Sequence, residues 1–398
     1  MTSEADAAVA WSALAEPCDA AALALIRVLG HAGALVWVRE AAEDLTAAAF
    51  ELASVPETAR RVMPACERWI ARLGIAEPDA LRARASRVGA RAITRGEPGW
   101  PARLADLEDA EPHALWVRGS IDLDVAWSAS VAIVGARAAT AYGAHISAEL
   151  AAVAAEAGLA VISGGAYGID AAAHRGALGA GGVTVAVLAG GVDRLYPAGN
   201  APLLERIAAT GAVVSELPPG FAPHRSRFLR RNRLIAAARA TVVVEAGLRS
   251  GALSTAREAR ELVRPLGVVP GPMTSASSAG CHALVRDHPE SVVVLGSPSH
   301  VLELARPIGE APEPDLPRGG PDFGSEHERQ AYGAIPLRGA SAAVIAIAAG
   351  LTGKEATEAL AALRGRGLAT VAAGVWNRAD HPDPPDKPDN TRQSRSEF

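Results

Sequence analysis

The stretch Leu159-Ala-Val-Ile-Ser-Gly-Gly-Ala-Tyr-Gly-Ile-Asp170 places a short apolar run directly before a glycine-rich segment. An unbroken apolar run of about five residues, without alternation, is typical of a strand buried on both faces. The glycines that follow predict a tight loop, and the apolar and polar spacing beyond Asp170 predicts a helix. This strand–loop–helix unit is repeated along the chain, and the repetition indicates the fold.

Further apolar runs, rich in β-branched residues, occur between about 128 and 296 and are separated by amphipathic segments. They are Val131-Ala-Ile-Val-Gly135, Val183-Thr-Val-Ala-Val-Leu188, Ala212-Val-Val-Ser215, Thr241-Val-Val-Val-Glu245 and Leu266-Gly-Val-Val-Pro270. Buried strands joined by helical crossovers form parallel sheets covered on both faces. We therefore predict an α/β fold with an extended, Rossmann-like, doubly wound parallel sheet, to which 114–118 and 292–295 add flanking strands.

Other parts of the chain have different patterns. Residues 1–88 have helical periodicity, with Gly30 as a helix stop and with Arg82 and Arg84 expected on solvated helix faces. Residues 89–306 contain the predicted sheet, and 307–324 are rich in Pro, Gly and acid, as a linker is. Residues 325–378 indicate a compact helical domain that ends in a β turn at Gly374-Val-Trp376, and 379–398 a disordered tail.

The composition limits the functional classes. The net charge of −5 over 398 residues excludes a globally basic protein, so any nucleic-acid site must be a local patch. Three scattered cysteines have no metal-ligand spacing, and no cofactor motif is recognised. An acidic N-terminal sequence and the lack of a charge-free apolar run of about 20 residues predict a soluble cytoplasmic protein without a membrane partner.

The carboxyl ends of parallel strands share one edge of a sheet, where ligands bind. The loops expected there contain glycine, arginine or hydroxyl side chains, which suit phosphate. Alone, each loop is equally explained as an ordinary turn, and the hypothesis depends on their convergence. The loop residues are Gly135-Ala-Arg137, Ser163-Gly164-Gly165, Gly190-Gly191 with Tyr196, and Arg249-Ser250-Gly251.

Asp170 and His174 are spaced i, i+4 and therefore lie on one face of the predicted helix. Such a pair suits acid–base chemistry if the carboxylate orients the imidazole. The alternative is structural, with Asp170 as an N-cap and His174 as a packing residue. We favour the structural interpretation.

The segment 225–239 contains six arginines and no acid. Phe228 and Asn232 lie within it. Arginine for phosphates and an aromatic ring for base stacking are what single-stranded nucleic acid requires. The alternative is a solvated helix face, although such faces usually mix charges of both signs.

Helical geometry divides this segment further. With Ser226 as N-cap, Phe228, Arg231 and Asn232 share one face. Arg233 points away from that face because adjacent side chains on a helix are about 100° apart. We therefore expect Arg233 to hold a carboxylate, such as Glu245 or Glu216, at a strand end.

Taken in order, these segments resemble the DprA/Smf family of DNA-processing proteins over about 90–290. The similarity includes the lead-in residues Trp100-Pro101, Leu104, Pro112 and Gly119. The motifs that carry it are Val134-Gly-Ala-Arg137 with Tyr142-Gly143, Ser163-Gly-Gly-Ala-Tyr-Gly-Ile-Asp170 with His174, Tyr196-Pro197, Ser215-Glu216, Phe228 with Arg231-Asn-Arg233, Val244-Glu-Ala246 with Ser250-Gly251, Thr255-Ala256 and Pro270-Gly271.

The resemblance implies a cytoplasmic homodimer that binds single-stranded DNA, protects it during natural transformation and helps to load a RecA-type recombinase. It implies an N-terminal SAM-like helical domain, a C-terminal winged helix and no catalytic residues. The DNA-binding residues that it implies are Arg137, Ser163, Gly164, Gly165, Phe228, Arg231, Asn232, Arg233, Arg249, Ser250 and Gly251. Arg249 stands where the family often has lysine.

The sequence departs from the family pattern in two places. Cys281-His282 replaces a small polar pair, which argues against a DNA role for that loop. The predicted winged-helix segment has few basic side chains. Nearby glutamates offset Lys354, Arg364 and Arg366, so a protein-interaction module is an alternative.

Two other functions remain as alternatives. Thr255-Ala-Arg-Glu258 has the Thr-x-x-Glu spacing of nucleotide phosphoribohydrolases of the same fold superfamily, but the preceding loop lacks their glycine-rich motif. A small-nucleotide sensor without DNA function is the third interpretation.

Overall fold

The computed structural model describes residues 2–306, 323–336 and 339–379. The chain divides into two compact units, Met1–Asp315 and Leu316–Phe398. Most of the predicted linker 307–324 and nearly all of the predicted tail 379–398 lie outside the described residues. Each unit is described by itself.

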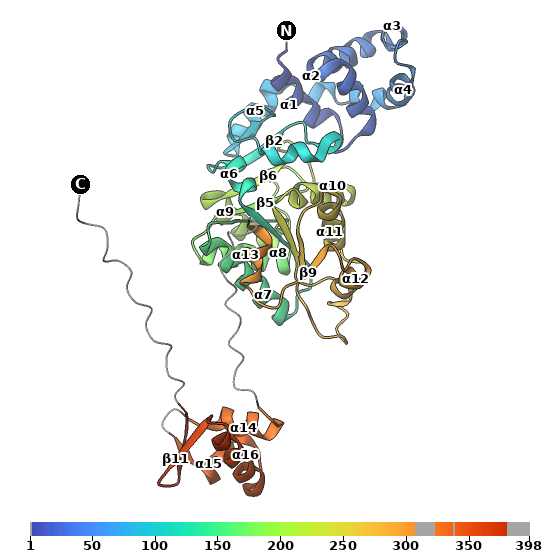
Figure 1. Ribbon diagram of the computed structural model, residues 1–398. Helices are drawn as coiled ribbons and strands as arrows, with labels where there is room; N and C mark the ends of the chain where they lie inside the picture. Colours follow the sequence, from blue (N-terminus) through green and yellow to red (C-terminus); the bar gives the residue numbers. More distant parts are fainter. Residues whose placement is uncertain (1, 307–322, 337–338, 380–398) are drawn as a thin grey trace, which may run out of the picture. The chain divides into compact units, whose positions relative to one another are not determined.

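A nine-stranded sheet is the centre of the first unit (Figure 1). Its strand order is β1-β2-β6-β5-β4-β3-β7-β8-β9. Strands β3 to β9 all run parallel to one another, which confirms the predicted parallel sheet. The strands are β1 (Ala90–Ile93), β2 (Leu115–Gly119), β3 (Ser130–Val134), β4 (Ala160–Ser163), β5 (Thr184–Val187), β6 (Ala212–Ser215), β7 (Ala240–Val243), β8 (Leu266–Val268) and β9 (Val292–Val294).

The strand order creates a topological switch point. From β3 the chain steps outward through β4 and β5 to β6, and then returns to β7 on the opposite side of β3. The crevice between the loops that follow β3 and β7 is where such sheets bind ligands. The predicted flanking strands are confirmed as β2 and β9, with β2 antiparallel to β6. Strand β1, which is antiparallel to β2, was not predicted.

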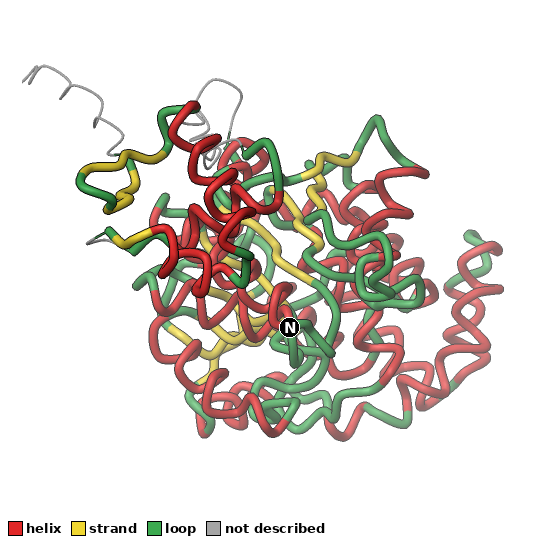
Figure 2. The backbone as a smooth tube through the Cα atoms, turned by 90° about the horizontal axis from the view of Figure 1, so that it is seen from below, coloured by secondary structure: helices red, strands yellow, loops and turns green. Residues whose placement is uncertain are grey.

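Helices cover both faces of the sheet (Figure 2). One core cluster lies under α7 (Ala141–Glu156), α8 (Ile169–Gly179) and α13 (His300–Ala305). Another contains apolar residues of the 3₁₀ segment η2 (Ala102–Ala110), α6 (Leu123–Ser128), α10 (Arg225–Ala236), α11 (Ala252–Glu261) and α12 (Ala279–Asp287). Helix α9 (Ala201–Thr210) packs on β5 and β6. These layers place α10 and α11 beside the switch point.

The predicted N-terminal helices are present and pack against one end of the sheet (Figure 1). The indole Nε1 of Trp116 on β2 donates a buried hydrogen bond of 3.2 Å to the Ser12 hydroxyl on α1. The helices are α1 (Glu4–Leu14), α2 (Ala20–Glu43), α3 (Leu45–Glu51), α4 (Pro56–Ile70), the short 3₁₀ turn η1 (Leu73–Ile75) and α5 (Pro78–Arg87). Their core is shared with the sheet.

The first helical run of α2 stops at Gly30 as expected, because its φ of 72° and ψ of 172° are not helical, and a second helical run follows this kink. Arg82 and Arg84, expected on solvated faces, contact Asp6 and the Pro219 carbonyl. Among the described helices, α2 alone is long and apolar enough to span a membrane. Its Leu25 and Trp37 are buried in this core, whereas Val28, Leu29 and Val36 are exposed.

The second unit contains three helices and a small sheet among its described residues. Its elements are α14 (Glu326–Ala334), β10 (Ala340–Ser341), α15 (Ala342–Ala349), α16 (Gly353–Gly365), β11 (Ala369–Ala372) and β12 (Val375–Arg378). The sheet order is β10-β12-β11. The core of this unit includes Ile345, Leu360 and Leu363. The turn predicted near Gly374 is the tip of the β11–β12 hairpin, where Gly374 has a φ of 79°.

Candidate nucleic-acid interface

A pocket of about 860 Å³ opens at the switch point. Segments that follow β3, β4, β5, β6 and β7 line it together, so the predicted convergence of loops at this edge of the sheet is confirmed. The predicted site residues at the pocket are Arg137, Phe228, Arg231, Asn232, Arg249, Ser250 and Gly251. Ser163, Gly164, Gly165 and Arg233 are not among the lining residues.

Positive charge dominates the rim of this pocket. Arg137, Arg225 and Arg249 are exposed, and no carboxylate pairs with Arg225 or Arg249 in the described chain. Helices α10 and α11 also begin at the pocket, and no capping hydrogen bond from an N-cap side chain is present at either. Helix N-termini carry a partial positive charge. The rim therefore suits anionic ligands, and Arg225 is a site residue that the sequence-based selection missed.

Two aromatic rings lie next to this charge. The centroids of Phe228 and Tyr196 are 5.7 Å apart, with 58° between the ring planes. The Arg137 guanidinium carbon lies 5.2 Å from the Phe228 centroid, within cation–π range. Tyr196 is exposed and was not selected as a site residue, although the segment containing it was singled out.

The proposed phosphate nest at Ser163-Gly164-Gly165 is filled by the protein itself. The Gly164 and Ala166 amides donate to one carboxylate oxygen of Asp170 at 3.1 and 3.4 Å. The buried Ser163 hydroxyl donates to the Ile133 carbonyl at 2.6 Å. A phosphate at this loop would therefore have to compete with the Asp170 carboxylate for the Gly164 and Ala166 amides.

The Asp170–His174 pair has the structural role that we favoured. His174 is fully buried, its Nδ1 lies 2.7 Å from the Thr184 hydroxyl, and burial lowers its pKa to about 3. Asp170 is not the N-cap, which is Gly168, but lies in the first turn of α8. Burial raises the pKa of Asp170, while Arg231 and the two loop amides act in the opposite direction.

A second buried carboxylate occupies the start of α7. Glu245, which is 2% exposed, accepts hydrogen bonds from the Thr140 amide at 3.0 Å and the Thr140 hydroxyl at 2.6 Å. Thr140 is the N-cap of α7, the helix that follows the first parallel strand. In dinucleotide-binding Rossmann folds the pyrophosphate lies at this helix N-terminus. In this protein the Glu245 carboxylate lies at that helix N-terminus.

Arg231 lies in the floor of the pocket rather than on its surface. It is 5% exposed and donates from Nη1 to the carbonyls of Val187 and, at 3.0 Å, Gly164. Burial lowers its pKa to about 10. It therefore ties α10 to the ends of β4 and β5 while it lines the pocket.

Arg233 points away from the pocket, as helical geometry predicted. Its Nη1 and Nη2 donate to the two Glu216 oxygens at 2.8 and 2.6 Å. Both side chains are under 10% exposed. The expected partnership with Glu216 is confirmed, the alternative partner Glu245 is wrong, and the buried Arg233 side chain does not line the pocket.

The rest of the arginine segment differs from an exposed basic patch. Arg227 is paired with Glu16, and Arg230 donates to the Pro17 carbonyl. The helix begins after His224, so the predicted N-cap Ser226 is wrong. The sequence therefore overstates the number of arginines available to a ligand, because Glu16 and Pro17, more than 200 positions earlier in the chain, bind Arg227 and Arg230.

The structure also places three other features that the sequence analysis singled out. Thr255 lines it, but Glu258 does not and is half-buried near Arg257. Asn232 donates to the Gly251 carbonyl at 3.4 Å and so links α10 to the start of α11. Cys281 is buried in the core, and His282 Nε2 lies 3.0 Å from the Gly271 carbonyl.

The fold and the pocket together define an α/β protein of the doubly wound class with an anion-attracting, aromatic-lined crevice at its switch point. Residues 91–304 match the sequence profile of the family described as DNA recombination-mediator protein A. The chain belongs to that family.

Individual relatives support the assignment. A Mycobacterium tuberculosis protein named as a DNA processing protein, DprA, is 49% identical over 306 residues, which cover 73% of this chain and 77% of the relative. Protein Smf of Escherichia coli is 38% identical over 206 residues, covering 51% and 54%. The X-ray structure of DprA from Streptococcus pneumoniae superposes with a TM-score of 0.54 at 32% identity, covering 61% of this chain and 82% of that one.

Proposed function

We propose that this protein binds single-stranded DNA across the switch-point pocket. The observation that carries the proposal is the pairing of the Arg137, Arg225 and Arg249 rim with the adjacent rings of Phe228 and Tyr196. Arginine binds phosphate, and aromatic faces accept bases that are not paired. A duplex does not present its base faces to such rings.

The filled anion positions argue against a mononucleotide as the ligand. Asp170 occupies the loop amides after β4, and Glu245 occupies the start of α7. A small nucleotide binds tightly by burying its phosphates at such amides. The remaining cations lie on an open rim, which suits a backbone with several phosphates that passes over the surface.

Family membership supports a wider role. We propose that the chain acts in DNA processing during natural transformation, as a cytoplasmic homodimer that protects single strands and assists a RecA-type recombinase. The binding surface comprises Arg137, Arg225, Arg249, Ser250 and Gly251 with the two rings, and no catalytic step is assigned to it. The order of helices and strands in 326–378 supports a winged-helix assignment for the second unit.

The direct test is a salt-titrated binding assay with a single-stranded oligonucleotide, its duplex and a nucleoside monophosphate. We expect the single strand to bind about tenfold or more tighter than the duplex, with affinity that falls steeply as salt rises. Equal affinity for the single strand and the duplex would contradict the proposal. Preference for the monophosphate would favour a nucleotide sensor.

Single substitutions separate the contribution of the aromatic rings from that of the arginine charge. Phe228→Ala should weaken binding by about 1–3 kcal/mol through lost stacking and leave the salt slope unchanged. Arg249→Ala should weaken binding and also flatten the salt slope by about one unit, because one phosphate contact is lost. The measurement is affinity at several salt concentrations. A reduced salt slope for Phe228→Ala would show that the ring does not act by stacking.

A further inference from the structure

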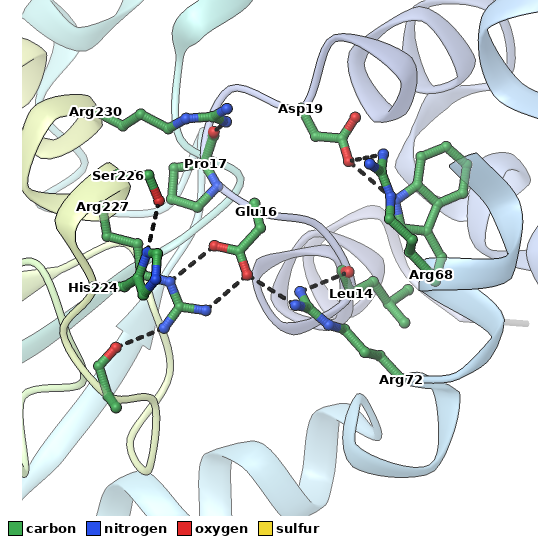
Figure 3. Close-up of polar contacts among 12 residues, drawn as sticks. Leu14, Glu16, Pro17, Asp19, Arg68, Arg72, His224, Ser226, Arg227 and Arg230 are labelled. Atoms are coloured by element: carbon green, nitrogen blue, oxygen red, sulfur yellow. Dashed lines mark hydrogen bonds and ion pairs between the residues drawn. The ribbon is translucent and has the colours of Figure 1, made fainter. Parts of the chain in front are cut away.

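The outer side of α10 is held by the short segment 15–19 that joins α1 to α2 (Figure 3). Arg227 forms a two-pronged ion pair with Glu16, with Nε–Oε2 and Nη2–Oε1 distances of 2.8 and 2.7 Å. Arg230, one turn further along, donates to the Pro17 carbonyl. Arg227 and Arg230 each directly precede a pocket residue on α10, Phe228 and Arg231.

Glu16 is itself fixed from the opposite side. The Arg72 guanidinium, just beyond the end of α4, donates to Glu16 Oε1 at 2.8 Å and to the Leu14 carbonyl at 3.2 Å. The hydrogen bond from Arg227, together with Arg72, lowers the pKa of Glu16 to about 2. One carboxylate therefore bridges the N-terminal helices and α10, and it stays ionised throughout the usual pH range.

Arg227 also extends this restraint to the loop before α10. Its Nη1 donates to the Ala222 carbonyl at 2.7 Å, and its guanidinium lies 5.5 Å from the Phe221 ring centroid. With a side chain that is only 12% exposed, Arg227 has little surface to offer to a ligand. Its contacts restrain the first turn of α10, which carries Arg225 and Phe228.

We propose that Glu16 is a positioning residue for the single-strand site. It does not line the pocket, but it sets the place of α10 and so of the Phe228 ring and the Arg225 charge relative to the loops after β3 and β7. This inference rests on the proposed function. It assigns the N-terminal helices a part in ligand binding that does not require them to touch DNA.

The test compares Glu16→Gln with a matched control, Asp19→Asn. Asp19 lies on the same segment and pairs with Arg68, away from α10 (Figure 3). It also caps α2, a role that asparagine retains. Both substitutions remove one negative charge, which alone strengthens DNA binding. We expect Glu16→Gln to bind the single strand roughly three- to tenfold more weakly and Asp19→Asn to bind no more weakly than the wild type.

A double-mutant cycle separates positioning from general destabilisation. Phe228 is on α10, whereas Arg249 is on the loop after β7. The effect of Glu16→Gln should shrink by at least about half in a Phe228→Ala background and persist in an Arg249→Ala background. A loss that is equal in both backgrounds would show that Glu16 supports the fold in general and would overturn the proposal.

The remaining outcomes are also decisive. Wild-type or stronger affinity of Glu16→Gln overturns the positioning role while the proposed function stands, whereas a wild-type protein that does not bind single strands overturns both. If Glu16→Gln does not fold, Arg227→Lys replaces it, because lysine keeps the charge but cannot form the two-pronged pair. Weaker binding by Arg227→Lys supports the inference, and unchanged binding overturns it.

Discussion

Arg233→Ala is expected to lower the free energy of unfolding by about 3–5 kcal/mol, because it leaves the buried Glu216 carboxylate without its cation. Arg233 also donates to the Ala110 carbonyl at 2.6 Å, so the contact between η2 and α10 weakens with it. The change should appear as a lower Tm and a lower urea midpoint. The affinity for single-stranded DNA, measured where the variant is folded, should stay near that of the wild type.

Two control variants test whether the lost stability comes from the buried ion pair. Arg61→Ala removes an exposed arginine paired with Glu57 and should cost at most about 1 kcal/mol. Combining Arg233→Met with Glu216→Gln removes both charges and should recover part of the loss. A variant Arg233→Ala that melts like the wild type but binds DNA weakly with a reduced salt slope would identify Arg233 as a DNA contact instead.

Arg231→Ala should be comparably destabilising, by about 3–5 kcal/mol, and should also weaken DNA binding. The substitution leaves Asp170 buried without the cation that opposes its raised pKa. The pKa of Asp170 in the folded state should then rise further above its unfolded value of about 3.9. The folded state then binds more protons than the unfolded state, so the stability of the variant should fall as pH rises through that window.

The measurement is denaturant unfolding of wild type and Arg231→Ala at about pH 5 and pH 8. The difference between the two proteins should be smaller at the lower pH, where Asp170 is more readily protonated. The variant with both Arg231→Ala and Asp170→Asn should lose this pH dependence. A difference in stability that is the same at both pH values would show that Asp170 is not the group left uncompensated.

The parallel sheet was predictable because each central strand is an unbroken apolar run that is buried on both faces. The segments 131–135, 159–163 and 212–215 all match observed strands closely. Strand β1 was missed because Ala90–Ile93 is four residues long and contains Arg91, which gives no apolar run. The break in α2 at Gly30 was predicted correctly, because glycine favours the positive φ that ends the first helical run there.

The site was predictable in position and less so in detail. Loop convergence follows from topology alone, so Arg137 and Arg249 were placed correctly. The pairing of Arg233 with Glu216 followed from the 100° step between adjacent helical residues. The contacts of Arg227 with Glu16 and of the Gly164 amide with Asp170 depend on distant or folded-back segments. No local pattern reports whether an arginine or an amide already has an internal partner.

The two internal carboxylates have a thermodynamic consequence for binding. Asp170 and Glu245 hold the loops after β4 and before α7 in place before any ligand arrives. Gly168, with its φ of 77°, lets the first of these loops lie directly against the backbone of Ala136 and Arg137. These two loops therefore lose little conformational entropy on association, and the ordering cost falls on the exposed rim arginines and on the DNA strand that we propose as the ligand. Association should accordingly proceed without a slow loop-closure step, at a rate governed by electrostatic attraction and by ionic strength.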